Sequence, residues 1–182
     1  RLADVVDVYI TNDEKPQLPD LLPTALGGSI QPCRRTPSLP RSDRFNEDAV
    51  GIYPERTRAN LKIQEGCNFF CTYCIVPYVR GKPRSRHWED ILREARALVR
   101  NGYRELVLTG VNIATYEDQG RRLPELLRAL TQISNDLRIR LSSTEPGPVL
   151  DDLLTVMADN PTQVCRFLHL PGGTDAWFPA RG

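Results

Sequence analysis

The chain has 182 residues, of which 40% are hydrophobic and 26% charged, and its formal net charge at pH 7 is +1. A chain of this length buries one hydrophobic core and leaves room for a small appendage. The charge near zero excludes a general attraction to nucleic acid, and no apolar run approaches the ~18 residues that a membrane-spanning helix needs. An odd number of cysteines, five, and the lack of a signal peptide favour a protein of the reducing cytoplasm.

The first part of the chain has few apolar positions. Residues 4–10 are rich in β-branched residues and predict a short strand, and a short helix or turn is expected around residues 18–22. Residues 27–58, rich in Pro, Gly, Ser and Arg, are typical of an interdomain linker in which Cys33 is incidental. A solvated linker is a simpler interpretation than an RNA contact for its arginines, which include Arg34, Arg35, Arg41 and Arg44.

Three of the five cysteines fall within eight residues, as Cys67, Cys71 and Cys74, in a C-x3-C-x2-C pattern after a strand expected at 60–64. Thiolates this close in sequence can converge on one metal centre, and cysteine is the usual ligand of iron–sulfur clusters. Three thiolates leave one iron of a cubane cluster open, and an open position distinguishes catalytic from structural metal sites. Two alternatives stay open on spacing alone: a zinc site that adds His87, and buried or disulfide-bonded cysteines.

Four cations follow the cysteines with no acidic residue between them: Arg80, Lys82, Arg84 and Arg86. Such a group suits a bound carboxylate or phosphate. The alternative is an exposed connector that binds nothing.

The rest of the chain alternates between helical and strand patterns. Apolar residues recur at helical spacing from Trp88 until Asn101 and Gly102 end the helix, and a second helix has Pro124 near its first turn. The other expected boundaries are a strand at 105–109, the end of the second helix near Ser134, a strand at 137–142, a helix at 149–158 and a strand at 166–170.

Strands that alternate with helices predict right-handed βαβ units and a parallel sheet. In such folds ligands bind at the carboxyl ends of the strands. Residues 110–112, residues 142–145 and His169 fall at these ends, as the three cysteines do.

Residues 56–86 resemble the radical S-adenosylmethionine (radical SAM) enzymes, whose hallmark is C-x3-C-x-aromatic-C; the aromatic residue here is Tyr73. Residues 102–116 and 138–146 are similar to later motifs of the methylthiotransferase branch, in the same order. Within that branch the chain looks most like the MtaB-type tRNA enzymes. The resemblance implies an α/β fold, namely an incomplete radical SAM (β/α) partial barrel with parallel strands, preceded by a linker and the tail of an N-terminal α/β domain.

The resemblance also divides the chain. The expected parts are the tail of an N-terminal methylthiotransferase domain at 1–26, a linker at 27–58, the partial radical SAM core at 59–170 and a divergent C-terminal tail at 171–182. The cysteines of the family's auxiliary cluster, the second half of its barrel and its RNA-binding domain find no match. The chain is therefore expected to be a fragment that is inactive alone, and the alternative is a non-catalytic iron–sulfur or zinc-binding remnant.

By resemblance, Cys67, Cys71 and Cys74 ligate a [4Fe–4S] cluster, and the amino and carboxylate groups of S-adenosylmethionine (SAM) chelate its open iron. Further contacts to SAM are expected from the backbone near Tyr73 and from Gly110, Asn112, Ser142, Ser143 and Glu145. A strand-end cap and an ordinary loop carboxylate are the alternatives for the last three. The four cations would hold the SAM carboxylate or a substrate phosphate.

The implied reaction is reductive cleavage of SAM to methionine and a 5′-deoxyadenosyl radical, with an electron donor such as flavodoxin or ferredoxin. A methylthio group is then added to C2 of N6-threonylcarbamoyladenosine in tRNA. Sister branches act on isopentenyladenosine in tRNA or on an aspartate of a ribosomal protein. In all of them the cofactor supplies the difficult chemistry and the protein positions and shields it.

Overall fold

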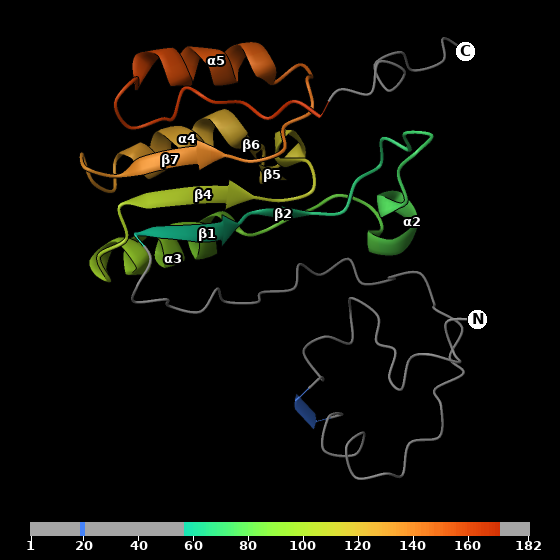
Figure 1. Cartoon of the computed structure of the whole chain (residues 1–182), viewed down its shortest axis with the longest axis horizontal. Helices are drawn as coiled ribbons and strands as arrows, with labels where there is room; N and C mark the ends of the chain where they lie inside the picture. The colour runs from blue at the N-terminus through green and yellow to red at the C-terminus, as the bar shows by residue number, and fades with distance from the viewer. Residues whose placement is uncertain (1–18, 21–56, 172–182) are drawn as a thin grey trace.

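The computed structural model describes residues 19–20 and 57–171 (Figure 1). The strand expected at 4–10, the cysteine at position 33 and the linker arginines lie outside the described residues, as does the tail beyond residue 171. None of the helices in the described ranges has the length and apolar character needed to span a membrane.

A parallel sheet of β1 (Arg58–Lys62), β4 (Glu105–Thr109) and β7 (Arg138–Leu141) forms the centre of the described structure, in the order β1-β4-β7. Leu61 of β1 lies opposite Leu108 of β4, which lies opposite Leu141 of β7. The expected parallel α/β fold is therefore confirmed. The sheet is open rather than closed into a barrel within the described part of the chain (Figure 1).

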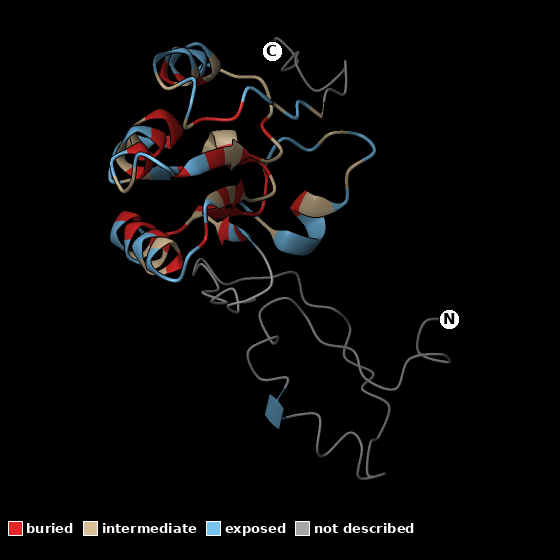
Figure 2. Ribbon diagram, turned by 60° about the vertical axis from the view of Figure 1, so that its left-hand side comes forward, coloured by how far each residue is buried: buried red, intermediate tan, exposed pale blue. Residues whose placement is uncertain are grey.

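The strands alternate between buried and more exposed positions, because successive side chains of a strand point to opposite faces. The buried positions all carry apolar side chains: Ala59, Leu61, Leu106, Leu108, Ile139 and Leu141. They share one core with α3 (Trp88–Arg100), α4 (Leu123–Thr131) and α5 (Leu150–Asp159). Figure 2 shows this core as the buried layer between the helices and the sheet.

The longest predicted elements agree with the structure. Helix α3 begins at Trp88, buries its apolar stripe and ends at Arg100, followed by Asn101 as C-cap and by Gly102 with a φ of +92°. Strand β4 has the predicted bounds, and α5 is displaced by one residue from its prediction. Helix α4 has Pro124 in its first turn but ends at Thr131, before the expected Ser134.

Two strand predictions were wrong in detail. The strand expected at 60–64 is two elements: β1 begins at Arg58 and ends at Lys62, and β2 (Gln64–Glu65) leaves the sheet to pair antiparallel with β3 (Arg84–Ser85). The strand expected at 166–170 is not regular.

In place of that strand, Val164 and His169 form isolated parallel bridges to Ile139 and Ser143. Between the bridges the N–H of Phe167 donates to the carbonyl of Cys165, two residues earlier, at 2.8 Å. The backbone therefore turns there, which interrupts the extended ladder.

Besides β3, three short features of the described chain had no predicted counterpart. They are α2 (Val76–Arg80), the 3₁₀ turn η3 (Ile113–Thr115) and a hairpin of β5 (Glu117–Asp118) with β6 (Arg121–Arg122). The hairpin turns at Gln119 and Gly120, whose φ angles are +53° and +79°. Two successive positive φ values are the signature of a type I′ turn, which suits a two-residue hairpin loop.

Candidate functional site

Residues 66–83, here called the cysteine loop, leave and re-enter the fold at the same place. The antiparallel β2–β3 ribbon joins its two ends, with Glu65 opposite Arg84. Gly66 has a φ of +74°, and a Cβ on it would lie 2.1 Å from the carbonyl oxygen of Lys82. The N–H of Cys67 donates to the carbonyl of Gly81 at 3.0 Å. Only glycine fits at position 66, because the returning chain occupies the space of a side chain.

The three cysteines of the loop interact electrostatically. Cys67 is buried, Cys71 and Cys74 are half-buried, and all three are free thiols. Burial raises the pKa of the Cys67 thiol, and the neighbouring Cys71 and Cys74 raise it further. The backbone N–H groups of Phe69 and Asn68 hydrogen-bond the Cys67 sulfur and lower that pKa. These N–H donors stabilise a thiolate at the point where the loop enters the protein.

This donor set fits an iron–sulfur cluster. Hydrogen bonds from the backbone to a ligating sulfur are one of the means by which proteins tune such clusters. Within the described ranges, no three His, Cys, Asp or Glu side chains stand together as the ligands of one metal ion. Cysteine thiolates are the usual ligands of such clusters.

Several apolar side chains of the loop are open to solvent in the described structure: Phe69 is 40% exposed, Phe70 57% and Ile75 67%. Phe70 makes an edge-to-face contact with Tyr78 of α2, with 5.6 Å between ring centroids. The loop therefore presents an apolar surface.

The loop after β4 carries Gly110 and Asn112 to the edge of the sheet where the cysteine loop begins. Asn112 is only 1% exposed, and its Oδ1 accepts hydrogen bonds from the N–H groups of Ala114 and Glu145, both at 3.2 Å. Its Nδ2 is buried and makes no hydrogen bond within the described structure. A buried donor without an acceptor is costly, so this amide suits a ligand that supplies one.

The loop after β7 lies beside the loop after β4. Ser143 accepts a backbone hydrogen bond from Ile113 at 3.1 Å, and its Oγ lies 3.2 Å from Nδ1 of His169. The hydroxyl of Ser142 is buried and has no hydrogen-bond partner in the described residues. Burial raises the pKa of Glu145, while the neighbouring His169 lowers it. This loop therefore offers a second buried donor without a partner, the Ser142 hydroxyl, and a carboxylate whose burial is poorly compensated.

Tyr73 of the cysteine loop lies within electrostatic range of Glu145 in the loop after β7. Desolvation raises the pKa of its hydroxyl, and the charges of Cys71 and Glu145 raise it further. Tyr73 is 70% exposed, so its ring lies on the surface rather than in the core. The three strand-end loops predicted to form one site thus meet in the structure.

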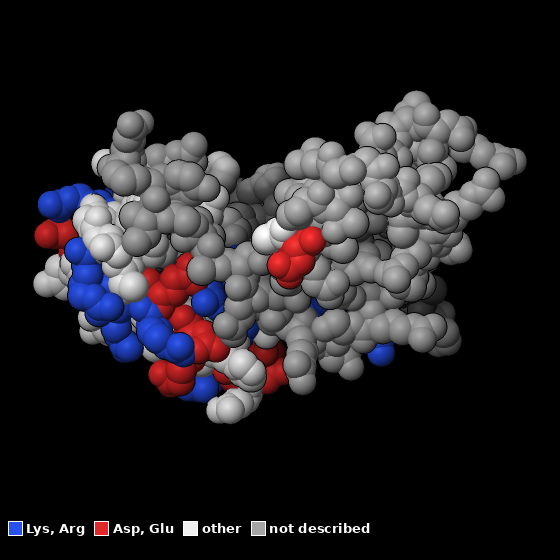
Figure 3. All heavy atoms as spheres, turned by 90° about the horizontal axis from the view of Figure 1, so that it is seen from below, with Lys and Arg blue, Asp and Glu red and all other residues white. Residues whose placement is uncertain are grey.

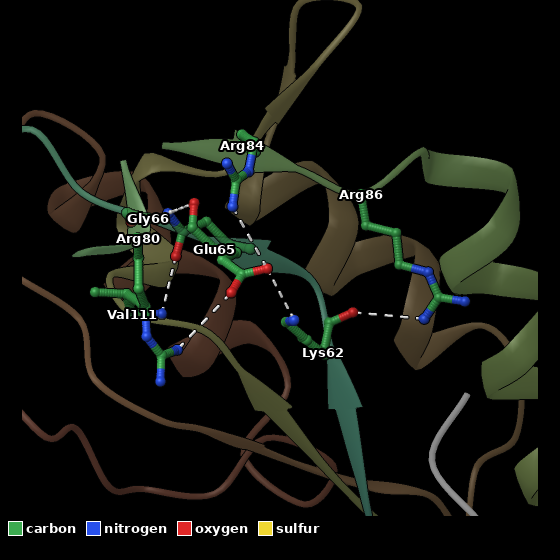
Figure 4. A network of polar contacts seen from close by, with 8 residues as sticks. Lys62, Glu65, Gly66, Arg80, Arg84, Arg86 and Val111 are labelled. Carbon is green, nitrogen blue, oxygen red and sulfur yellow. Dashed lines mark hydrogen bonds and ion pairs between the residues drawn. The ribbon is translucent and has the colours of Figure 1, made fainter. Parts of the chain in front are cut away.

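The four cations after the cysteines divide into two pairs. Arg80 and Lys82 are exposed, whereas Arg84 and Arg86 are buried. Arg84 lies 3.7 Å from the carboxylate of Glu65, and Arg86 approaches the carbonyl of Lys62 at 3.5 Å (Figure 4). Arg86 also pairs with Glu94. Contacts inside the protein thus surround Arg84 and Arg86, whereas Arg80 and Lys82 lie on the surface.

Sequence reasoning missed two residues that organise the site. Glu65 is 1% exposed and lies among Lys62, Arg80 and Arg84 (Figure 4). Gln64 is fully buried and bonds to the Gly110–Asn112 loop. The sequence contains one signal for these two residues. An amide and an acid stand immediately before Gly-Cys, at positions where a strand buried on both faces would carry apolar residues.

Outside the site, opposite charges are interleaved. Figure 3 shows lysines and arginines side by side with aspartates and glutamates on the described part of one face. His87, the fourth ligand of the zinc alternative, precedes α3 and lies 3.4 Å from Asp118. Asp118 also accepts a hydrogen bond from the N–H of Trp88, so it caps the start of α3.

Comparisons with known proteins agree with this geometry. The chain is 38% identical over 144 residues to the threonylcarbamoyladenosine tRNA methylthiotransferase MtaB of Bacillus subtilis, which covers 78% of this chain and 32% of that protein. It is 47% identical over 117 residues to the tRNA-2-methylthio-N(6)-dimethylallyladenosine synthase of Carboxydothermus hydrogenoformans, covering 63% and 26%. The chain therefore spans about a third or less of these relatives.

Among solved structures, the radical SAM methyltransferase TsrM of Kitasatospora setae, with tryptophan and a SAM analogue bound, has a similar fold. The TM-score is 0.50 at 17% identity, over 62% of this chain and 21% of that one. The model of the Radical SAM superfamily matches residues 61–171, more than half of the chain. With the cysteine loop and the open parallel sheet, this match shows that the chain belongs to the Radical SAM superfamily.

Proposed function

We propose that the chain forms the SAM-cleaving core of a tRNA methylthiotransferase. The observation that carries the proposal is the meeting of the cysteine loop with two orphan buried donors, Asn112 Nδ2 and the Ser142 hydroxyl, at the carboxyl edge of a parallel sheet. A [4Fe–4S] cluster and SAM bound at this edge would supply one-electron chemistry.

The cysteines and the two buried donors would bind different groups. Cys67, Cys71 and Cys74 would hold the cluster, with Cys67 stabilised by backbone N–H donors. The orphan donors of Asn112 and Ser142 would hydrogen-bond the polar groups of SAM.

Glu145 and Tyr73 would complete the binding site. Glu145 resists ionisation because it is desolvated, and a sulfonium cation nearby would offset that cost. The backbone at Tyr73 would border the adenine.

For the substrate, we propose an N6-modified adenosine of tRNA that receives a methylthio group at C2. The names of the relatives divide between threonylcarbamoyladenosine and dimethylallyladenosine. The segment Leu-Lys-Ile-Gln-Glu-Gly-Cys at 61–67 resembles the MtaB type, so N6-threonylcarbamoyladenosine is the first candidate. Flavodoxin or ferredoxin would supply the electron.

The 182-residue polypeptide alone would cleave SAM without transferring a methylthio group. Outside the cysteine loop it has only Cys33 and Cys165. Cys165 is buried, 3.5 Å from a guanidinium nitrogen of Arg138. These two cysteines do not supply the ligands of a second cluster.

The test of the proposal is anaerobic reconstitution with iron and sulfide. We expect about four irons per chain and a brown protein that yields 5′-deoxyadenosine from SAM after chemical reduction. Cys71→Ala should lose both, while Cys165→Ala, the matched control outside the loop, should keep both. Stoichiometric zinc in place of iron after anaerobic purification would contradict the proposal and favour the zinc-binding alternative.

The proposed transfer of a methylthio group to tRNA is measured separately. Mass spectrometry of nucleosides from a tRNA carrying N6-threonylcarbamoyladenosine should show no methylthio product with the polypeptide alone. A product would show that the remaining cysteines suffice.

A further inference from the structure

Gln64 lies where the cysteine loop meets the loop after β4. Its side chain is fully buried and makes four hydrogen bonds, all to backbone. Nε2 donates to the carbonyls of Glu65 at 3.0 Å and Gly66 at 2.7 Å. Oε1 accepts from the N–H groups of Val111 and Asn112, both at 3.0 Å. One side chain therefore joins the residue before Cys67 to the loop that carries Asn112.

The four partners require an amide at position 64. Two backbone N–H groups need an acceptor and two carbonyls need donors, and glutamine supplies both kinds at the end of one side chain. A carboxylate would bring oxygen against the carbonyls of Glu65 and Gly66. An apolar side chain would leave all four backbone groups without these partners, which is costly in a buried position.

The loop after β4 is also shaped to fit against Gln64. A Cβ at Gly110 would lie 2.9 Å from Oε1 of Gln64 and 2.9 Å from Cγ2 of Ile113. Glycine at position 110 thus lets the loop approach Gln64 closely enough for Val111 and Asn112 to donate. This contact explains the glycine from within the protein, without a ligand.

From this geometry we infer that Gln64 is a positioning residue, which fixes the distance between the cysteine loop and Asn112. The inference rests on the proposed function, in which the cysteines hold the cluster and Asn112 binds SAM. SAM must then reach both loops at once, so its affinity depends on their separation. Gln64 itself touches neither the cluster nor SAM in this scheme.

The experiment compares the Gln64→Leu and Gln64→Glu variants with the wild-type protein. The Leu variant removes all four hydrogen bonds, and the Glu variant keeps the acceptor for Val111 and Asn112 but not both donors. Gln163→Leu is the matched control, because Gln163 also donates to two backbone carbonyls, those of Thr131 at 2.8 Å and Ser134 at 2.9 Å. It lies away from the cysteine loop.

Two readouts are needed. Hydrogen exchange on the cluster-free protein reports the amides of Val111 and Asn112, which should exchange at least about tenfold faster in Gln64→Leu than in the wild type. Equilibrium dialysis of SAM with reconstituted protein should show about tenfold weaker binding in Gln64→Leu at unchanged iron content, as expected for lost buried hydrogen bonds. Gln64→Glu should weaken SAM binding while protecting the two amides better than Gln64→Leu. The Gln163→Leu control should bind SAM as the wild type does.

The outcomes separate the inference from the proposed function. Wild-type protein that takes up no cluster or binds no SAM refutes the proposed function. Wild-type SAM affinity in a reconstituted Gln64→Leu or Gln64→Glu protein refutes the positioning role, even when amide exchange is faster. If Gln64→Leu does not fold, Gln64→Glu, which keeps the shape of the side chain, decides the question.

Discussion

Glu65 and Arg84 lie opposite each other in the ribbon that closes the cysteine loop. Their side chains are only 1% and 6% exposed, and Oε2 of Glu65 lies 3.7 Å from Nη2 of Arg84. Lys62 reaches the same carboxylate at 3.0 Å and Arg80 at 3.9 Å. One buried anion thus compensates cations that arrive from both ends of the loop.

Replacing Glu65 should therefore destabilise the protein strongly. Removing one partner of a buried ion pair leaves an uncompensated charge, and Glu65→Gln should lower the free energy of unfolding by about 3 kcal/mol in urea titrations. Asp152→Asn is the control, since Asp152 and Arg122 pair on the surface, where a pair contributes at most about 1 kcal/mol. Equal losses in the two variants would show that the buried pair has no special role.

The crowding at Gly66 gives a second prediction. Gly66 and Gly102 both have positive φ, +74° and +92°, but only Gly66 has atoms within 4 Å of an added Cβ. Gly66→Ala should therefore prevent closure of the ribbon and abolish cluster uptake. Gly102→Ala should pay only backbone strain, about 1 kcal/mol, and should reconstitute with normal iron content. Iron analysis and thermal unfolding of both variants measure the difference, and equal uptake would contradict the clash.

Glu145 predicts a pH dependence of stability. Burial raises its pKa above the ordinary value of 4.5. The protonated form is then favoured by folding, so its contribution is complete at low pH and is lost as pH rises through the raised pKa. Glu145→Gln should therefore gain stability over the wild type as the pH rises above the ordinary glutamate value of 4.5, in thermal unfolding of the cluster-free protein.

The control for this pH effect is Glu89→Gln, which replaces an exposed carboxylate in the first turn of α3. A carboxylate at this position stabilises the helix by interacting with its dipole, so replacing it should not raise the stability of the protein at neutral pH. If Glu89→Gln gained as much stability as Glu145→Gln, burial of Glu145 would not be the cause of the gain.

The core gives a prediction independent of the site. Leu108 in the middle strand is fully buried, whereas Leu154 of α5 is 44% exposed. Leu108→Ala should lower the free energy of unfolding by about 2–5 kcal/mol because it leaves a cavity. Leu154→Ala should cost less than about 1 kcal/mol. Urea titrations that place the two losses in the reverse order would contradict the assigned core.

Elements with a long apolar pattern were predictable from the sequence. Helix α3 repeats its apolar residues over three turns, and β4 is a compact apolar run that ends directly before Gly110. The placement of the cysteine, Gly110 and Ser142 loops at one edge followed from parallel pairing alone. These are features that many residues determine together.

Features that depend on a few long-range contacts were not predictable. The β2–β3 ribbon pairs two residues with two others about twenty positions later, too few to leave a period in the sequence. The burial of Arg84 depends on Glu65, and the importance of Gln64 depends on Val111 and Asn112. Such roles arise from the tertiary contact itself, and residue type alone does not reveal them.

The alternating burial of the central strands has a consequence for engineering. The helix-packed face holds the apolar residues that keep the chain folded, while Asn60, Val107, Thr109 and Arg140 lie on the other, more exposed face of the same strands. Substitutions on that second face leave the core contacts of their neighbours in place. A library restricted to those positions would therefore vary the more exposed face of the sheet while most of its members stay folded.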